Sequence, residues 1–187
     1  PTANLAVTES WNGTSWTEVA DLSTARNLIA SAGADNLSAL ASGGTTGSPT
    51  GATEEWNGAA PVGAWSTGGD LNSGRENTSG SGTELAALCV GGDVSNNTQS
   101  AVTESYNGSS WTEVNDLNEG RYYIGRAGVS NTSALAISGD RAPPPSPPTK
   151  SANTESWNGS SWTEVNNVND KRSVTASNGT ITSALIY

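Results

Sequence analysis

Four arginines and four glutamates recur at matching places along the chain, and no other charged residue does so. They are Arg26, Arg75, Arg121 and Arg172, with Glu9, Glu54, Glu104 and Glu155. A guanidinium group holds a carboxylate or a sulfate through parallel hydrogen bonds, so a ring of such groups could bind an acidic ligand. The arginines could instead bind the glutamates or the carbonyl groups of loops and so join neighbouring strands. Because binding sites usually break the symmetry of a repeated scaffold, we favour the structural role.

Residues that occur in a single repeat are better candidates for a binding site. Tyr122, Tyr123 and Arg126 stand close together in the third repeat and have no counterparts in the others. Tyrosine and arginine are enriched at binding surfaces, and tyrosine combines an apolar ring with a polar hydroxyl. The cluster could therefore bind a sugar or a peptide, although packing in the core is the interpretation that we favour.

The loop over residues 140–152 is another departure from the repeat. Five prolines within residues 143–148 impose an extended polyproline II conformation and a stiff projection. Proline-rich segments dock into aromatic grooves of partner proteins, so Pro144 and Pro147 are candidate contact residues. An inert insertion is an equally good interpretation.

The sequence offers little chemistry for catalysis. It contains no histidine, which removes the commonest metal ligand and general base. Acidic pairs such as Glu54 and Glu55 have no companion nucleophile or base. The single cysteine, Cys89, replaces small apolar residues of the other repeats and is interpreted as a buried hydrophobe. We therefore expect no enzyme activity, no cofactor and no metal site.

The four glutamates belong to a segment of sequence that is repeated along the chain. The run Thr-Glu-Ser-Trp-Asn-Gly at residues 8–13 returns at 154–159, and with tyrosine in place of tryptophan at 103–108. A diverged copy begins at Thr53, and the marker glutamates are 45, 50 and 51 residues apart. This period is typical of propellers and solenoids.

The repeated run that contains Asn-Gly, together with the residues after it, predicts a β-hairpin. Residues 7–11 and 16–20 are short runs rich in Thr, Val and Trp, and Asn-Gly stands between them. A two-residue turn would place Glu9 opposite Trp16, whereas a four-residue turn would place Glu9 opposite Glu18. Because like charges repel across a strand pair, we predict the two-residue turn.

A second pair of strands is expected in each repeat. The first members are residues 27–32, 77–81, 122–127 and 173–177, and the second members are 38–42, 85–90, 134–137 and 184–187. A polar link such as 33–36 joins each pair. The first members carry very small side chains, which indicates that they crowd against one another, and glycines at 43–44 allow a sharp exit.

The pattern resembles kelch repeats. Gly43 and Gly44 match the doubled glycine of that family, Glu54 and Trp56 its glutamate-aromatic pair, and Trp65 and Arg75 its later tryptophan and arginine. The repeats also resemble those of kelch-like proteins from marine phages and aquatic bacteria. The resemblance implies an all-β fold, a β-propeller of four-stranded antiparallel blades.

The chain is expected to form one domain with four blades. The repeat units are residues 25–68, 74–117, 121–168, and 172–187 joined with 1–22, so the strand pairs near the two ends would complete one blade and close the ring. A fragment of a longer ring and two chains that pool four blades each are the alternatives.

Charge restricts the partners that we expect. The net charge of −10 disfavours nucleic acid and anionic membranes, and no apolar run reaches the length of a membrane span. We therefore expect a non-enzymatic recognition or structural module on a virion appendage, such as a tail fibre, or on a cell surface. Its variable loops would bind a glycan or a protein, and other assembly subunits or further copies of the chain are candidate partners. An intracellular adaptor is the alternative, and a sugar-modifying propeller enzyme is a weaker one.

Overall fold

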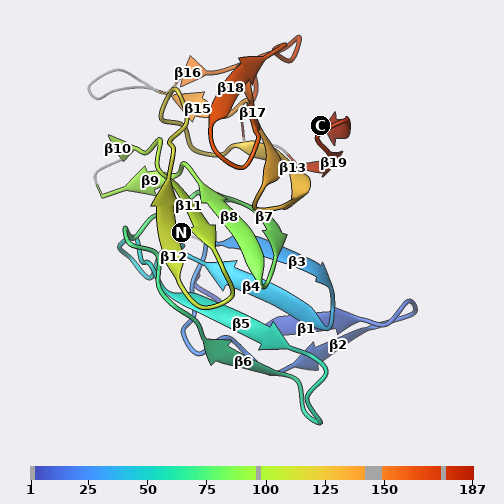
Figure 1. Cartoon of the computed structure of the whole chain (residues 1–187). Helices are drawn as coiled ribbons and strands as arrows, with labels where there is room; N and C mark the ends of the chain where they lie inside the picture. The colour runs from blue at the N-terminus through green and yellow to red at the C-terminus, as the bar shows by residue number, and fades with distance from the viewer. Residues whose placement is uncertain (1–2, 96–97, 142–148, 174–175) are drawn as a thin grey trace.

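Three antiparallel four-stranded sheets form most of the structure, a computed structural model that describes residues 3–95, 98–141, 149–173 and 176–187 (Figure 1). Sheet A contains β3 (Ala30–Asp35), β4 (Ser38–Ser42), β5 (Thr53–Asn57) and β6 (Ala64–Thr67). Sheet B contains β7 (Ser79–Thr83), β8 (Ala86–Val90), β11 (Thr103–Tyr106) and β12 (Trp111–Val114). Sheet C contains β13 (Gly125–Ser130), β14 (Ser133–Ile137), β17 (Thr154–Trp157) and β18 (Trp162–Val165).

Two hairpins stand at the ends of this row of sheets. The N-terminal hairpin pairs β1 (Thr8–Trp11) with β2 (Trp16–Val19), and the C-terminal hairpin pairs β19 (Ser177–Thr180) with β20 (Ser183–Ile186). Short pairs in the loops are β9 (Asp93–Val94) with β10 (Thr98–Gln99), and β15 (Asp140–Arg141) with β16 (Thr149–Lys150). The expected all-β class is confirmed, since the described segments hold no helix and thus no apolar helix that could cross a bilayer.

The turns after Trp11, Tyr106 and Trp157 have four residues, so the prediction of a two-residue turn is wrong. Trp11 lies opposite Trp16, with ring centroids 5.5 Å apart, and Glu9 lies opposite Glu18. The Asn12 side-chain oxygen accepts hydrogen bonds from the backbone amides of Thr14 and Ser15, both at 2.9 Å. The contact between the two tilted indole rings and this local capping by asparagine together stabilise the longer turn.

A nearby guanidinium group offsets the repulsion that argued against this register. In sheet C, Glu155 lies opposite Glu164. Arg121, from the loop that enters the same sheet, contacts Glu155 at 2.5 Å. Burial lowers the pKa of Arg121, and both glutamates oppose that shift. The positive charge of Arg121 therefore attracts both carboxylates and offsets their mutual repulsion.

The first strands begin later than the sequence predicts. Leu28, Asn77 and Tyr123 have positive φ angles of 56°, 54° and 53°, so the chain turns there before the strand starts. In sheet A, the strand also continues through most of the predicted link at 33–36, with a bulge between Gly33 and Asp35. The turn itself lies at residues 36–37.

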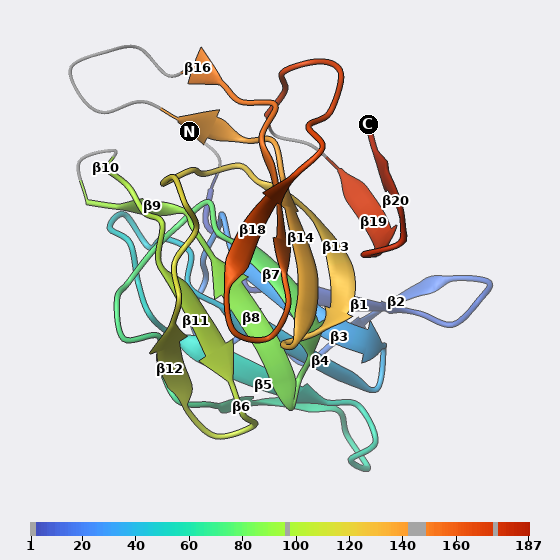
Figure 2. The same ribbon diagram turned by 45° about the horizontal axis from the view of Figure 1, so that its top comes forward.

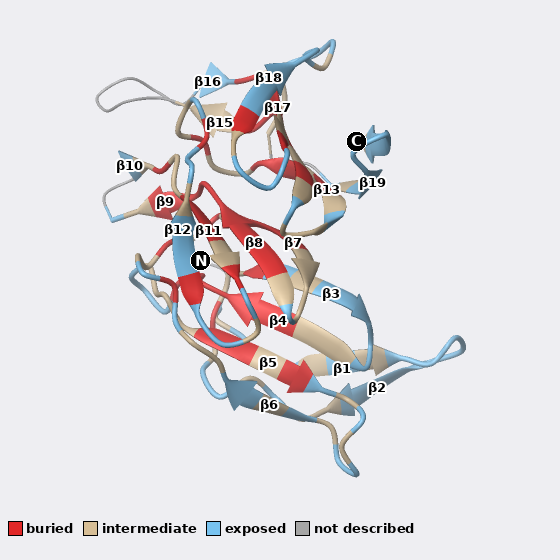
Figure 3. Cartoon of the chain, in the orientation of Figure 1, coloured by how far each residue is buried: buried red, intermediate tan, exposed pale blue. Residues whose placement is uncertain are grey.

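The first strands pack side by side, as their small residues indicate. β3 contacts β7, β7 contacts β13, and β13 contacts β19. A methyl group at Gly80 would lie 2.6 Å from the Ser31 carbonyl oxygen, so only glycine fits there. Buried residues gather in the middle strands, whereas β1, β2, β19 and β20 contain none (Figure 3).

The two terminal hairpins lie apart. Figure 2 shows the N-terminal hairpin beside sheet A and the C-terminal hairpin beside sheet C. Asn36 of sheet A donates to Ser10 Oγ at 3.0 Å, and Ser177 Oγ accepts the backbone N–H of Arg126 at 2.6 Å. β1 and β20 belong to separate two-stranded sheets.

Candidate functional site

Three of the repeated arginines are enclosed by their own sheets. Arg26, Arg75 and Arg121 contact Glu54, Glu104 and Glu155 at 3.1, 2.7 and 2.5 Å, and the arginine side chains have no exposed surface. Each guanidinium also donates to backbone carbonyls between the second and third strands, as Arg75 does to Gly91 and Val102 at 2.9 and 2.6 Å. These groups therefore clamp the loop that enters each sheet to its third strand.

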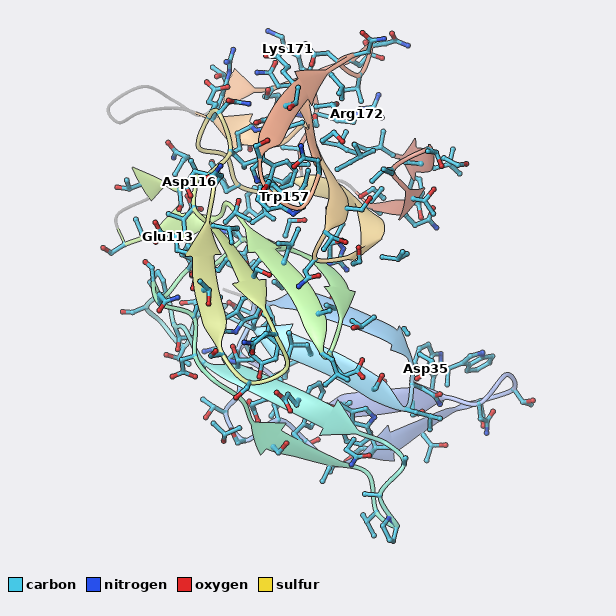
Figure 4. The ribbon with its side chains drawn as sticks, viewed as in Figure 1. Asp35, Glu113, Asp116, Trp157, Lys171 and Arg172 are labelled. Carbon is cyan, nitrogen blue, oxygen red and sulfur yellow. The ribbon has the colours of Figure 1, made fainter. Side chains whose placement is uncertain are left out.

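The fourth repeated arginine has a different environment. Arg172 remains one-third exposed, and its guanidinium lies 3.8 Å from the exposed carboxylate of Asp170. Figure 4 shows Trp157 inside sheet C, whereas Lys171 and Arg172 lie in the loop that follows β18. The corresponding glutamate, Glu9, belongs to the N-terminal hairpin at the other end of the row and is exposed.

Tyr122 and Tyr123 lie where the chain enters sheet C. Their ring centroids are 4.8 Å apart, and both rings are partly buried. Burial raises the pKa of both phenols, and the carboxylates of Asp93 and Asp140 raise it further. The Tyr122 amide donates to the Asp140 carbonyl at 3.1 Å, which fixes the tyrosines beside the loops that carry the acids.

The tyrosines thus face an acidic rim that the sequence analysis missed. Asp93 is buried, and Asn77 donates to its carboxylate at 3.1 Å. Desolvation raises the pKa of Asp93 to about 6, the Asn77 hydrogen bond lowers it, and Glu76 raises it. The sequence does contain a signal for this rim. In two repeats an aspartate, Asp93 or Asp140, directly follows the glycine that ends the second strand.

Arg126 is separated from the tyrosines and points into the space between the first strands. Its Nη1 donates to the backbone carbonyls of Ser31, at 2.5 Å, and Gly80, and its Nη2 donates to Ser31 Oγ at 3.2 Å. The three-residue cluster expected from the sequence is therefore divided between the entrance to sheet C and the central space.

Two cavities lie against Arg126. A cavity of about 400 Å³ is lined mainly by small residues of sheets A and B, together with Asp35. A second cavity of about 280 Å³ is lined by Ile29, Ser31, Thr78, Ser79, Ile124, Arg126, Ala176 and Ser177. The central space can therefore hold a small molecule on either side of the guanidinium group.

The proline loop falls outside the described residues, which include neither Pro144 nor Pro147. The preceding residue that is described, Arg141, forms an exposed ion pair with Glu119 at 2.9 Å. Cys89 is fully buried, and burial raises the pKa of its thiol. Within the described ranges, no group of three or more acidic or cysteine side chains is arranged to hold a metal ion.

Comparison with known proteins assigns no family to this geometry. No protein-family model matches the chain, and no curated protein matches it.

Proposed function

We propose that the chain is a kelch-like β-propeller that acts as a non-enzymatic recognition or structural module on a virion appendage or a cell surface. The three sheets would be complete blades, and their packed first strands would line the propeller axis. The location follows from the resemblance of the repeats to those of phage and aquatic bacterial proteins.

Closure of the ring by the terminal hairpins is part of this proposal. Trp111 of sheet B donates to Thr53 of sheet A at 3.0 Å, and Trp162 of sheet C donates to Thr103 of sheet B at 3.0 Å. In each case, a tryptophan of one sheet donates to a threonine of the sheet before it. In a closed ring, the indole of Trp16 would donate in the same way to Thr154 of sheet C, whose hydroxyl is buried without a hydrogen-bond partner among the described residues.

The recognition surface would be the rim around Tyr122 and Tyr123. The observation that carries this assignment is the contrast in symmetry: three of the four repeated arginine–glutamate pairs form buried ion pairs, whereas the tyrosine pair and its acidic rim occur once. Partly buried aromatic rings beside carboxylates can stack on a sugar ring and accept hydrogen bonds from its hydroxyl groups. The same groups can bind a basic or polar protein segment.

A glycan array and a pull-down with the purified chain would test the proposal. The variant Tyr122→Ala/Tyr123→Ala should lose at least about tenfold in affinity for the ligand that is found, because aromatic residues dominate binding energy at such surfaces. Thr14→Ala/Ser15→Ala, in an exposed hairpin turn away from the rim, is the control and should bind normally. A folded chain that binds neither glycans nor proteins would contradict the recognition role.

A further inference from the structure

Arg126 is the one long, charged side chain at its level of the central space. Ser31, Gly80 and Ser177 occupy the matching position in the other repeats. Arg126 contacts all three of them, through its guanidinium to Ser31 and Gly80 and through its backbone amide to Ser177. A single cation therefore fills a layer to which the other repeats contribute only small residues.

Among the described residues, no anion balances the charge of Arg126. Arg75 and Arg121 each contact a glutamate within 2.7 Å, but in the part of the chain that the structure describes no carboxylate lies within ion-pair distance of Arg126. Its acceptors are neutral oxygens of Ser31 and Gly80. Desolvation lowers the pKa of Arg126, and no charged group opposes that shift. A half-buried cation of this kind gains free energy when an anion binds beside it.

Arg126 also has hydrogen-bond donors to spare. A guanidinium group has five N–H bonds, and described residues accept three of them, two from Nη1 and one from Nη2. In any guanidinium group, the Nε–H and one N–H of Nη2 lie parallel on one edge, and no described residue accepts a hydrogen bond from Nε of Arg126. This edge has the geometry that holds the two oxygens of a carboxylate.

The smaller cavity suits an anion better than the larger one. Asp35 lines the cavity of about 400 Å³ and would repel a carboxylate. The cavity of about 280 Å³ has no acidic residue in its lining, and Ser31, Thr78, Ser79 and Ser177 contribute hydroxyl groups that can donate hydrogen bonds. Ile29 and Ile124 add an apolar wall.

We propose that this smaller cavity is a binding site for a small carboxylate, held by the free edge of the Arg126 guanidinium group. The inference goes beyond the proposed recognition role, because the site lies in the central space and uses neither tyrosine of the rim. The carboxylate can belong to a small organic acid or to an acidic sugar residue, and the volume of the cavity admits a group no larger than about one sugar ring.

Calorimetric titration of the chain with acetate, glucuronate and neutral glucose tests the site. Saturable binding of glucuronate or of both carboxylates, without binding of glucose, is the expected result. Binding of acetate alone would assign the site to small organic acids, and tighter binding of glucuronate would assign it to acidic sugars. Equal binding of glucose, or no saturable binding of either carboxylate, would overturn the proposal.

Variants of Arg126 separate the site from the rim. Arg126→Gln should weaken carboxylate binding at least about tenfold. Arg126→Lys should weaken it less, because lysine keeps the positive charge, but it should not restore full affinity, because lysine lacks the two parallel donors. Arg141→Gln removes an exposed arginine and should leave the affinity unchanged. Circular dichroism checks that each variant is folded. Unchanged affinity in folded Arg126→Gln contradicts the site, and the tyrosine double variant should still bind the carboxylate.

Discussion

At the scale of single residues, the buried arginine–glutamate pairs should matter more to stability than any exposed ion pair. Arg75 and Glu104 are both fully buried and 2.7 Å apart. Glu104→Gln leaves the guanidinium charge buried without a counter-charge, so we expect the free energy of unfolding to fall by about 3–5 kcal/mol. Glu119→Gln breaks the exposed pair with Arg141 and should cost less than about 1 kcal/mol. Urea denaturation measures both, and equal losses would contradict the clamp.

Asp93 should make stability depend on pH. Its pKa is raised from 3.8 to about 6, mainly by desolvation, so the folded state favours the protonated acid. The stabilisation that protonated Asp93 gives the folded state is complete below the pKa of this residue in the unfolded chain. It is lost as the pH rises through the pKa of Asp93 in the folded chain. Asp93→Asn removes the penalty of the charge and keeps an acceptor for Asn77. The variant should therefore be more stable than the parent near pH 7, by up to about 3 kcal/mol.

The pH profile itself checks this prediction. The stability difference between Asp93→Asn and the parent should shrink as the pH falls from about 6 towards about 4 and should be small below that range. Asp170→Asn, at a side chain that is 86% exposed, is the matched control and should change the free energy of unfolding by less than about 1 kcal/mol. A constant difference at all pH values would contradict the raised pKa.

At the scale of elements, the four-residue turn depends on its asparagine. Asn158 accepts hydrogen bonds from the amides of Ser160 and Ser161, both at 2.9 Å. Asn158→Ala removes this acceptor and should lower the free energy of unfolding by about 1 kcal/mol, whereas Asn158→Asp keeps the acceptor and should cost less. Thermal and urea unfolding compare the two. An alanine variant as stable as the parent would contradict the capping role.

The same turn shows where sequence reasoning about elements succeeds and where it stops. The strands and their pairing follow from local signals, namely Asn-Gly between runs of Thr, Val and Trp. The register does not, because the repulsion between Glu155 and Glu164 is removed by Arg121, which lies far away in the sequence. The late start of the first strands likewise depends on positive φ at Leu28 and Tyr123, which no residue preference predicts.

Prediction of the candidate site has the same limit. The sequence identifies Tyr122, Tyr123 and Arg126 as unrepeated residues, but it cannot say that a strand carries them to different places. Asp93 joins the tyrosines only through contacts between sheets B and C. The carboxylate site depends on Ser31 and Gly80, which are distant in sequence from Arg126. Comparison of the repeats identifies such residues in the sequence, whereas three-dimensional contacts define the site.

At the scale of the whole molecule, the proposed ring requires the two terminal hairpins to complete one blade. In sheets B and C, Leu88 lies opposite Ser105 and Leu135 lies opposite Ser156. Leu185 and Ser10 occupy the matching positions in the two hairpins, and Leu185 is 69% exposed. If β20 pairs with β1, these two residues meet directly, at a separation that a disulfide can span.

Ser10→Cys/Leu185→Cys should therefore crosslink under mild oxidation within one chain and increase the melting temperature. Cys89 should not interfere, since it is fully buried and burial raises the pKa of its thiol. Ser10→Cys/Ser183→Cys, displaced by two residues from the expected register, is the control and should crosslink more slowly. Non-reducing electrophoresis separates the outcomes: an intramolecular crosslink supports a four-bladed ring, a crosslinked dimer means that two chains complete each other's blades, and no crosslink contradicts pairing of β20 with β1. A closed ring also predicts that Trp16, 64% exposed in the open arrangement, becomes shielded from a fluorescence quencher once the crosslink forms.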